Sequence, residues 1–119
     1  MFVNDKQRSR VCYVLLALCS ERFADQFWAE PENEGPTKYG LDAVLGIRKG
    51  FRSGISHGQA LLLQVAFDFW NGLGQAPIHS VCNDLDISLV TAIGELMTAV
   101  ANNRVDVWLE NYDKAERFG

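Results

Sequence analysis

The stretch from Ala60 to Trp70 constrains the fold most, because it is apolar on nearly every side of a helix and has only two polar residues. Ser56, with Gln59 three residues later, matches a capping box just before this run. Gly72 follows it and suits a helix C-cap. A helix without a polar face has to be covered by other elements. The sequence therefore predicts a buried central helix, with a strand as the weaker alternative.

Amphipathic segments lie on both sides of this central helix. Apolar residues recur at helical spacing from Asp5 to Trp28, which predicts one long N-terminal helix. Shorter helices are expected over residues 40–49, Ile78–Asp84, Leu89–Ala101 and Arg104–Phe118. The last segment begins with Val105-Asp106-Val107 and could instead start as a strand of a short hairpin.

These elements predict the fold class. We expect a mostly all-α, compact bundle of about five or six helices, with a short C-terminal β-hairpin as an option. Residues 1–119 should form a single helical domain, because 119 residues match the usual size of one. The segments Asp5–Trp28 and Leu89–Ala101 are expected to pack on the central helix.

The distribution of charge is uneven. From Ser53 to Asn103 there are four acidic residues and no lysine or arginine, whereas the rest of the chain holds eleven of each sign. This stretch therefore carries the whole formal net charge of −4. The surface of the folded core should be neutral to acidic, which makes nucleic acid an unfavourable partner for it.

Residues 77–101 have the outline of a helix-turn-helix, with Leu85-Asp86-Ile87-Ser88 as the turn. A recognition helix needs arginine, lysine, asparagine or glutamine to reach bases and phosphates. The second helix here offers Thr91, Glu95 and Thr98 instead. We interpret the outline as a packing unit, or as a degenerate form of the DNA-binding motif.

A basic patch lies elsewhere, at Lys38, Arg48, Lys49 and Arg52, with two aromatic residues interleaved. Basic and aromatic side chains together can hold single-stranded nucleic acid. A nucleic-acid-binding regulator that uses residues 38–52 is therefore the alternative functional hypothesis. The simpler interpretation is a solvated face whose positive charges balance the negative charges of the acidic loop just upstream.

The sequence favours no catalytic or metal site. Cys12, Cys19 and Cys82 have no disulfide-framework spacing, and reduced thiols in a cytoplasmic protein are the simpler expectation. His79 and Cys82 provide too few ligands for a metal site, and Cys82 is expected to be buried. We predict no enzyme activity, no metal and no cofactor. No stretch is long and apolar enough to predict a membrane span.

Protein-binding residues are predicted near the ends of helices. Trp28 and Trp108 lie beside charged residues, and exposed tryptophan is a favoured anchor of protein interfaces. The acidic loop that holds Glu30, Glu32 and Glu34 could add charged contacts. We therefore expect these five residues to belong to a surface that binds another protein.

A weak outline also resembles known sequences. It comprises the following residues: Ser53-Gly54, Leu62, Ala66, Asp68, Trp70-Asn71-Gly72 and Leu85-Asp86. The outline resembles small α-helical proteins of phages and bacteria that have no assigned function. The resemblance implies a soluble helical protein of phage or mobile-element type, a class that often binds and blocks a host protein. It transfers no functional residue, because the outline marks packing and caps.

The best functional hypothesis from sequence is thus a non-catalytic protein-binding module. Its sharpest form is a phage or mobile-element inhibitor of a host protein complex, of the anti-defence type. The partner would be another protein, whereas nucleic acid and membrane are not expected. A homodimer is also compatible with so dense a set of apolar helices.

Overall fold

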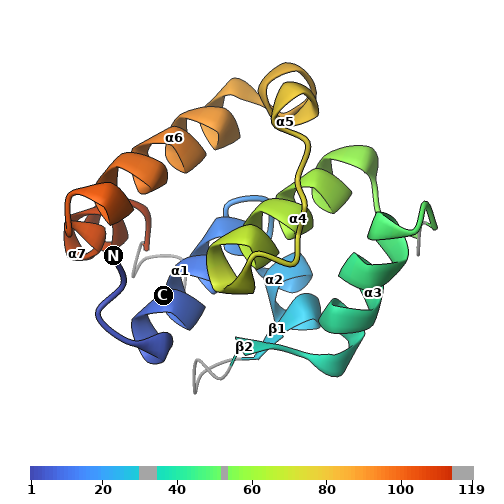
Figure 1. The fold of residues 1–119 in the computed structure, drawn as a ribbon, viewed down its shortest axis with the longest axis horizontal. Coiled ribbons are helices and arrows are strands. Elements are labelled where there is room, and N and C mark those ends of the chain that lie inside the picture. The colour runs from blue at the N-terminus through green and yellow to red at the C-terminus, as the bar shows by residue number, and fades with distance from the viewer. Residues whose placement is uncertain (30–34, 52–53, 114–119) are drawn as a thin grey trace.

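Helices dominate the computed structural model, which describes residues 1–29, 35–51 and 54–113 (Figure 1). Seven helices lie in these ranges: α1 (Asp5–Ala17), α2 (Glu21–Phe27), α3 (Lys38–Arg48), α4 (His57–Asn71), α5 (Ile78–Asp84), α6 (Ile87–Ala101) and α7 (Val105–Tyr112). Two short strands, β1 (Trp28–Ala29) and β2 (Gly35–Pro36), pair antiparallel. The mostly helical class is confirmed, and the helix count exceeds the five or six expected.

The predicted long N-terminal helix is two helices. α1 ends at Ala17, and the hydroxyl of Ser20 accepts a hydrogen bond from the backbone N–H of Phe23, which caps the start of α2. A serine at this position satisfies one of the backbone donors that a helix start leaves without an intrahelical partner. The chain can therefore turn between the helices, and α2 ends at the strand pair.

The described part of the C-terminal segment is helical, so the optional hairpin there is wrong. Val105 and Trp108 lie three residues apart on one helix face, and both side chains are buried. The indole N–H of Trp108 donates to the carbonyl of Ala92 in α6 at 3.0 Å. Helical spacing buries both side chains at once, whereas alternation along a strand would place them on opposite faces.

The predicted caps of α4 are confirmed. Ser56 and Gln59 form a complete capping box, and Gly72 ends the helix in the left-handed conformation at φ +77°. Residues 60–67 are buried without a break, as expected of a central helix. α4 packs against α1, in which residues 11–17 are also all buried. The core is thus built around two helices rather than one.

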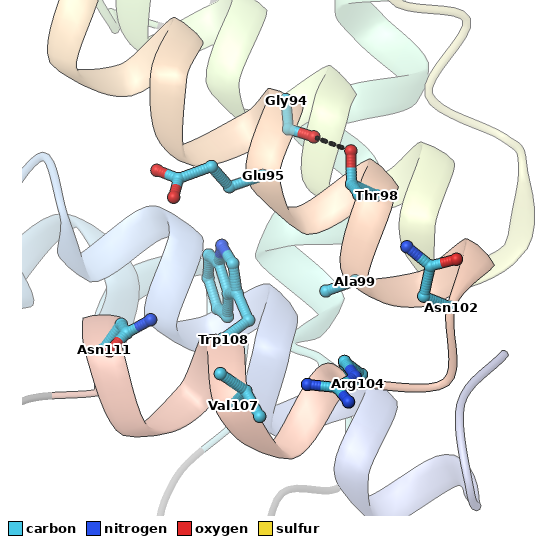
Figure 2. A pocket seen from close by; sticks show the side chains of 9 residues that line it. All are labelled: Gly94, Glu95, Thr98, Ala99, Asn102, Arg104, Val107, Trp108 and Asn111. Carbon is cyan, nitrogen blue, oxygen red and sulfur yellow. Dashed lines mark hydrogen bonds between the residues drawn. The ribbon is translucent and has the colours of Figure 1, made fainter.

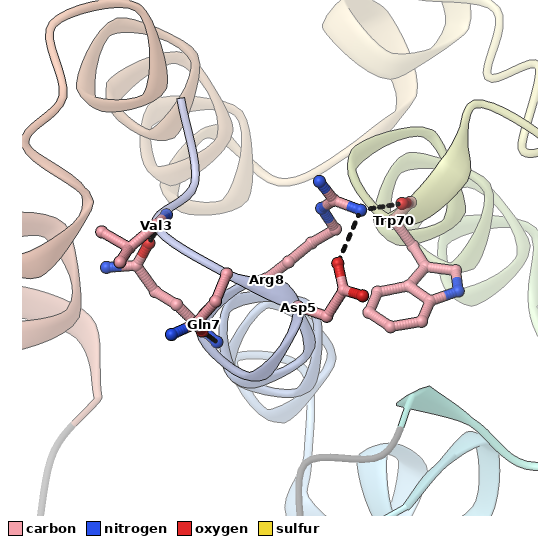
Figure 3. A network of polar contacts seen from close by, with 6 residues as sticks. Val3, Asp5, Gln7, Arg8 and Trp70 are labelled. Atoms are coloured by element: carbon pink, nitrogen blue, oxygen red, sulfur yellow. Dashed lines mark hydrogen bonds and ion pairs between the residues drawn. The ribbon is translucent and has the colours of Figure 1, made fainter.

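Polar contacts inside this core join α1 to its neighbours. Ser9 is fully buried, and its hydroxyl accepts a hydrogen bond from the indole N–H of Trp28 at 2.9 Å. Arg8 lies near the start of α1 and donates to the carbonyl of Trp70 at the end of α4, at 3.4 Å (Figure 3). The same guanidinium pairs with Asp5 at 3.2 Å. The Arg8 contact joins the start of α1 to the end of α4, and the Ser9 contact joins α1 to β1.

α6 occupies one side of the molecule, with α5 at its start and α7 at its end (Figure 1). Its main packing partner is α7 rather than α4, which corrects the expectation that Leu89–Ala101 packs on the central helix. α7 is held to α1 by two hydrogen bonds between Arg10 and Asp113, at 2.7 and 2.8 Å. Within the described residues, no helix has the length and apolar character needed to cross a membrane.

Candidate functional site

An open groove of about 540 Å³ lies between α4, α5 and α6. We call it the α4–α6 groove. Its lining is mostly apolar and includes Val65, Phe69, Val81, Val90, Ile93 and Met97. The groove exists because α6 packs mainly on α7 and so leaves part of its apolar surface turned toward α4 and α5 without filling the space.

The loop after α4 sets the position of the wall that α5 forms. The carboxylate of Asp68 accepts hydrogen bonds from the backbone N–H groups of Gln75 and Ala76, at 2.8 and 2.9 Å. The buried amide of Gln64 donates to the carbonyl of Gly74 at 3.2 Å. The two polar residues of the central helix therefore anchor the loop that leads into α5.

Gly74 is required at the closest point of this loop. A Cβ built there would lie 1.8 Å from the carbonyl oxygen of Gln64, far inside van der Waals contact. Any other residue would push the loop away from α4 and strain the hydrogen bonds described above. The close approach of this loop to α4 thus depends on a glycine.

Large apolar side chains remain exposed around the groove. Ile78 in α5 is 70% exposed, and Met97 in α6 is 54% exposed. Ile87, the first residue of α6, is 76% exposed. Scattered exposed apolar residues are ordinary, but a contiguous apolar patch on a protein surface marks an interaction site. Ile78 and Met97 line the same groove, so exposed apolar side chains gather there and make it the candidate interaction surface.

Gly94 lies in the middle of α6 and lines both the groove and a second pocket beside it. A Cβ built at this position meets no atom within 4 Å from the described residues outside its own stretch of helix. Glycine in the interior of a helix is less stable than alanine. The fold described here gives no reason for this glycine, because there is space for a larger residue.

The second pocket, of about 340 Å³, lies between α6 and α7 (Figure 2). Its walls carry polar groups, among them Glu95 and Arg104. The hydroxyl of Tyr112 donates to Glu95, and this hydrogen bond, followed by burial and the carboxylate charge, raises the pKa of Tyr112 to about 12. The carboxylate thus already has a partner within the fold, and its geometry indicates a structural link between α6 and α7.

Cys82 lines the α4–α6 groove and is exposed, so the expectation that it is buried is wrong. The open groove explains the difference, because α6 does not close over this part of α5.

Cys12, by contrast, is fully buried, and burial raises the pKa of its thiol well above the usual range. His79 contacts Asn83 on its own helix. No group of three metal-binding side chains occurs among the described residues.

The two tryptophans predicted as exposed anchors lie in the core, which corrects that expectation. Trp28 is 0% exposed, and its ring packs edge-on against Phe67 and Trp70. Trp108 is 2% exposed. Both indole N–H groups find acceptors inside the protein, so the rings can be buried without an unsatisfied donor. The other predicted contacts, at Glu30, Glu32 and Glu34, lie outside the described residues.

The structure divides the predicted basic patch. Lys38 is the first residue of α3 and Arg48 is the last, so the length of the helix, about 15 Å, separates them. Arg48 and the following Lys49 are both exposed, close in sequence to Phe51, which is 68% exposed. Arg52 lies outside the described residues. The described part of the patch is therefore a pair at the end of α3 and a separate lysine at its start.

The exposed apolar side of α6 is the feature that sequence reasoning missed. A signal exists, because Ile87, Val90, Gly94, Met97 and Ala101 recur at helical spacing. Together with Ile93 and Leu96 they make α6 apolar on more of its surface than one buried stripe requires.

Comparison with protein-family models, curated proteins and solved structures gave no match for this chain.

Proposed function

We propose that this protein is a non-catalytic module that binds another protein through the α4–α6 groove. The observation that carries the proposal is the groove itself, with Ile78 and Met97 exposed in one apolar hollow of about 540 Å³. Burial of an exposed isoleucine or methionine side chain is worth about 1.5–3 kcal/mol. A partner that covers several such residues gains a large part of the free energy that specific binding needs.

The polar groups near the groove support binding rather than chemistry. Asp68 accepts two backbone hydrogen bonds from its own loop, and Cys82 shares the lining with apolar side chains. A nucleophile needs an adjacent base within hydrogen-bond reach. No such pair is formed by the described residues that line the groove.

The sharper form of the proposal is an inhibitor of a host protein complex, encoded by a phage or a mobile element. This form rests on the outline between Ser53 and Asp86 described above. Its test is affinity capture from a host lysate with two matched variants. Ile78→Ser changes a groove residue that is 70% exposed, and Phe51→Ser changes a residue of 68% exposure outside the groove lining.

We expect the wild type and the Phe51→Ser variant to recover the same stoichiometric partner, and the Ile78→Ser variant to lose it. Thermal melts of the three proteins should agree, because both side chains are exposed in the free protein. A partner that is retained by Ile78→Ser and lost by Phe51→Ser would place binding at the end of α3 instead.

The alternative proposal is a nucleic-acid-binding regulator that uses residues 38–52. The exposed pair Arg48 and Lys49, close in sequence to the exposed Phe51, supports it. It predicts binding of single-stranded DNA or RNA that weakens steeply with salt. The triple replacement of Arg48, Lys49 and Arg52 by alanine should abolish this binding, and unchanged affinity would exclude the patch.

A further inference from the structure

We infer that the α4–α6 groove takes one amphipathic helix whose apolar face is flanked by lysine or arginine. This inference rests on the proposed function and specifies the chemistry of the partner. Three observations carry it: the helical lining of the groove, the open space at Gly94, and the acidic groups around α5 and α6.

The lining decides the conformation of the occupant. Apart from Ala76, every lining residue belongs to α4, α5 or α6, where helical hydrogen bonding already engages the backbone. An extended peptide would bury its own N–H and C=O groups against an apolar wall without partners. A helix satisfies these groups internally, which makes helix-in-groove recognition the suitable mode.

The dimensions and the space at Gly94 agree with a helical occupant. On α6 the groove lining runs from Val90 to Met97, about 10 Å along the helix axis, which matches about two turns of a partner helix. At the centre of this length, Gly94 has no Cβ, and no described residue outside its own stretch of helix fills the space where one would be. A glycine allows another backbone to approach closely. A helix that crosses α6 here gives this glycine a role that the isolated fold does not.

The charges decide the composition of the partner. Asp68 lies in the groove lining, and Asp84 and Asp86 lie at the junction of α5 and α6. Asp84 contacts His57 at 2.9 Å. Among the described residues, neither lysine nor arginine lines the groove. Basic flanks on the partner would be attracted, and acidic flanks would be repelled.

The same charges argue against a second copy of this chain as the occupant. A symmetric dimer built on this groove would bring the acidic groups of α5 and α6 from both copies into one interface. Like charges opposed across an interface are unfavourable. Self-association through the groove is therefore an outcome of the test that would overturn the inference.

The test uses three synthetic amphipathic peptides of about 16 residues, long enough for about four helical turns. They share one leucine face and differ only in their flanks, which are lysine, glutamine or glutamate. A fourth peptide scrambles the lysine version so that no apolar face remains. Affinity is measured by fluorescence anisotropy of the labelled peptide with the full chain. Protection of Cys82 from a maleimide reports the position of binding, and the exposed Cys19 is the internal control.

We expect the lysine peptide to bind at least about tenfold more tightly than the glutamine peptide, a difference of about 1.4 kcal/mol. The glutamate and scrambled peptides should bind more weakly than both. Asp84→Asn with Asp86→Asn should reduce the preference for lysine and leave the glutamine peptide unchanged. Ile78→Ser should weaken every groove-bound peptide, whereas Phe51→Ser should not.

The possible failures are distinct. Equal affinity for the three flanks, with Cys82 protected, would overturn the basic partner and leave the protein-binding function standing. If no peptide protects Cys82, the helical occupant is overturned, and the protein-binding function is decided by the lysate capture with Ile78→Ser. If the scrambled peptide binds as tightly as the lysine peptide, charge alone explains the affinity. This result would overturn the proposal of a helical occupant. A dimer in light scattering whose Cys82 is protected without peptide would assign the groove to a second copy.

Discussion

Replacement of Gly94 by alanine should raise the stability of the protein and lower its affinity for a partner. The added Cβ meets nothing within 4 Å among the described residues beyond its own stretch of helix, and the position is interior to α6 and helical. Alanine is therefore free of strain here and restricts the unfolded chain more than glycine does. The same methyl group would stand on the surface of α6, between the groove and the pocket beside it.

The size of the stability effect follows from the helix propensities. Glycine in a helix interior is about 0.8–1.0 kcal/mol less favourable than alanine. For a chain of 119 residues, the unfolding entropy at the melting temperature is about 0.25 kcal/mol/K. A gain of about 1 kcal/mol should therefore raise the melting temperature by about 4 °C. Affinity should fall by about tenfold or more if a partner helix has to move away from α6.

Gly46→Ala is the matched control, because Gly46 is interior to α3 and its Cβ would make an ordinary contact of 3.9 Å with Phe51. It should stabilise the protein by a similar amount and leave partner binding unchanged. Calorimetry gives the melting temperature, and peptide anisotropy gives the affinity. A loss of stability in Gly94→Ala would refute the reasoning, because it would mean that other atoms already occupy the space beside α6. If that loss grew with protein concentration, the atoms would belong to a second copy.

Three further predictions test the fold. Gly74→Ala should lower the free energy of unfolding by about 2–3 kcal/mol, because its Cβ would lie 1.8 Å from the Gln64 carbonyl oxygen. Urea denaturation measures this loss, and an unchanged midpoint would contradict the close contact. The stability linked to the raised pKa of Tyr112 should be present below pH 10.0 and lost as the pH rises through about 12. Glu95→Ala should shift the titration of Tyr112, followed by ultraviolet absorbance, toward 10.0, and no shift would exclude Glu95 as its cause. Of the three cysteines, Cys12 alone should resist a maleimide under native conditions, and rapid labelling of all three would show that the core opens.

Features fixed by neighbouring residues were predictable from the sequence. The capping box at Ser56 and the C-cap at Gly72 both depend on a few adjacent positions, and both occur as expected. The split after α1 was missed, although Ser20 is a good N-cap, because the apolar spacing continues across it. Periodicity alone does not distinguish one long helix from two short helices that bury the same side.

Burial of the tryptophans depended on contacts distant in sequence. The acceptor for the Trp28 indole is Ser9, nineteen positions away, and that for Trp108 is Ala92, sixteen positions away. Neighbouring charged residues suggested exposure for both rings. A tryptophan is buried where its N–H finds an acceptor, and the sequence does not show which distant groups fold against it.

The groove was the hardest feature to predict, because it depends on a contact that does not form. An apolar helix such as α6 predicts burial, and the sequence suggested that α4 would provide it. In the structure α7 covers one side of α6, where Trp108 donates to the carbonyl of Ala92, and the side toward α4 remains open. The absence of basic residues from Ser53 to Asn103 helps to explain why this side of α6 stays open. Lysine and arginine cover apolar surface with their long stems, and without them the apolar groove stays accessible and its surroundings stay acidic. A basic amphipathic helix would supply both the missing cover and the missing charge.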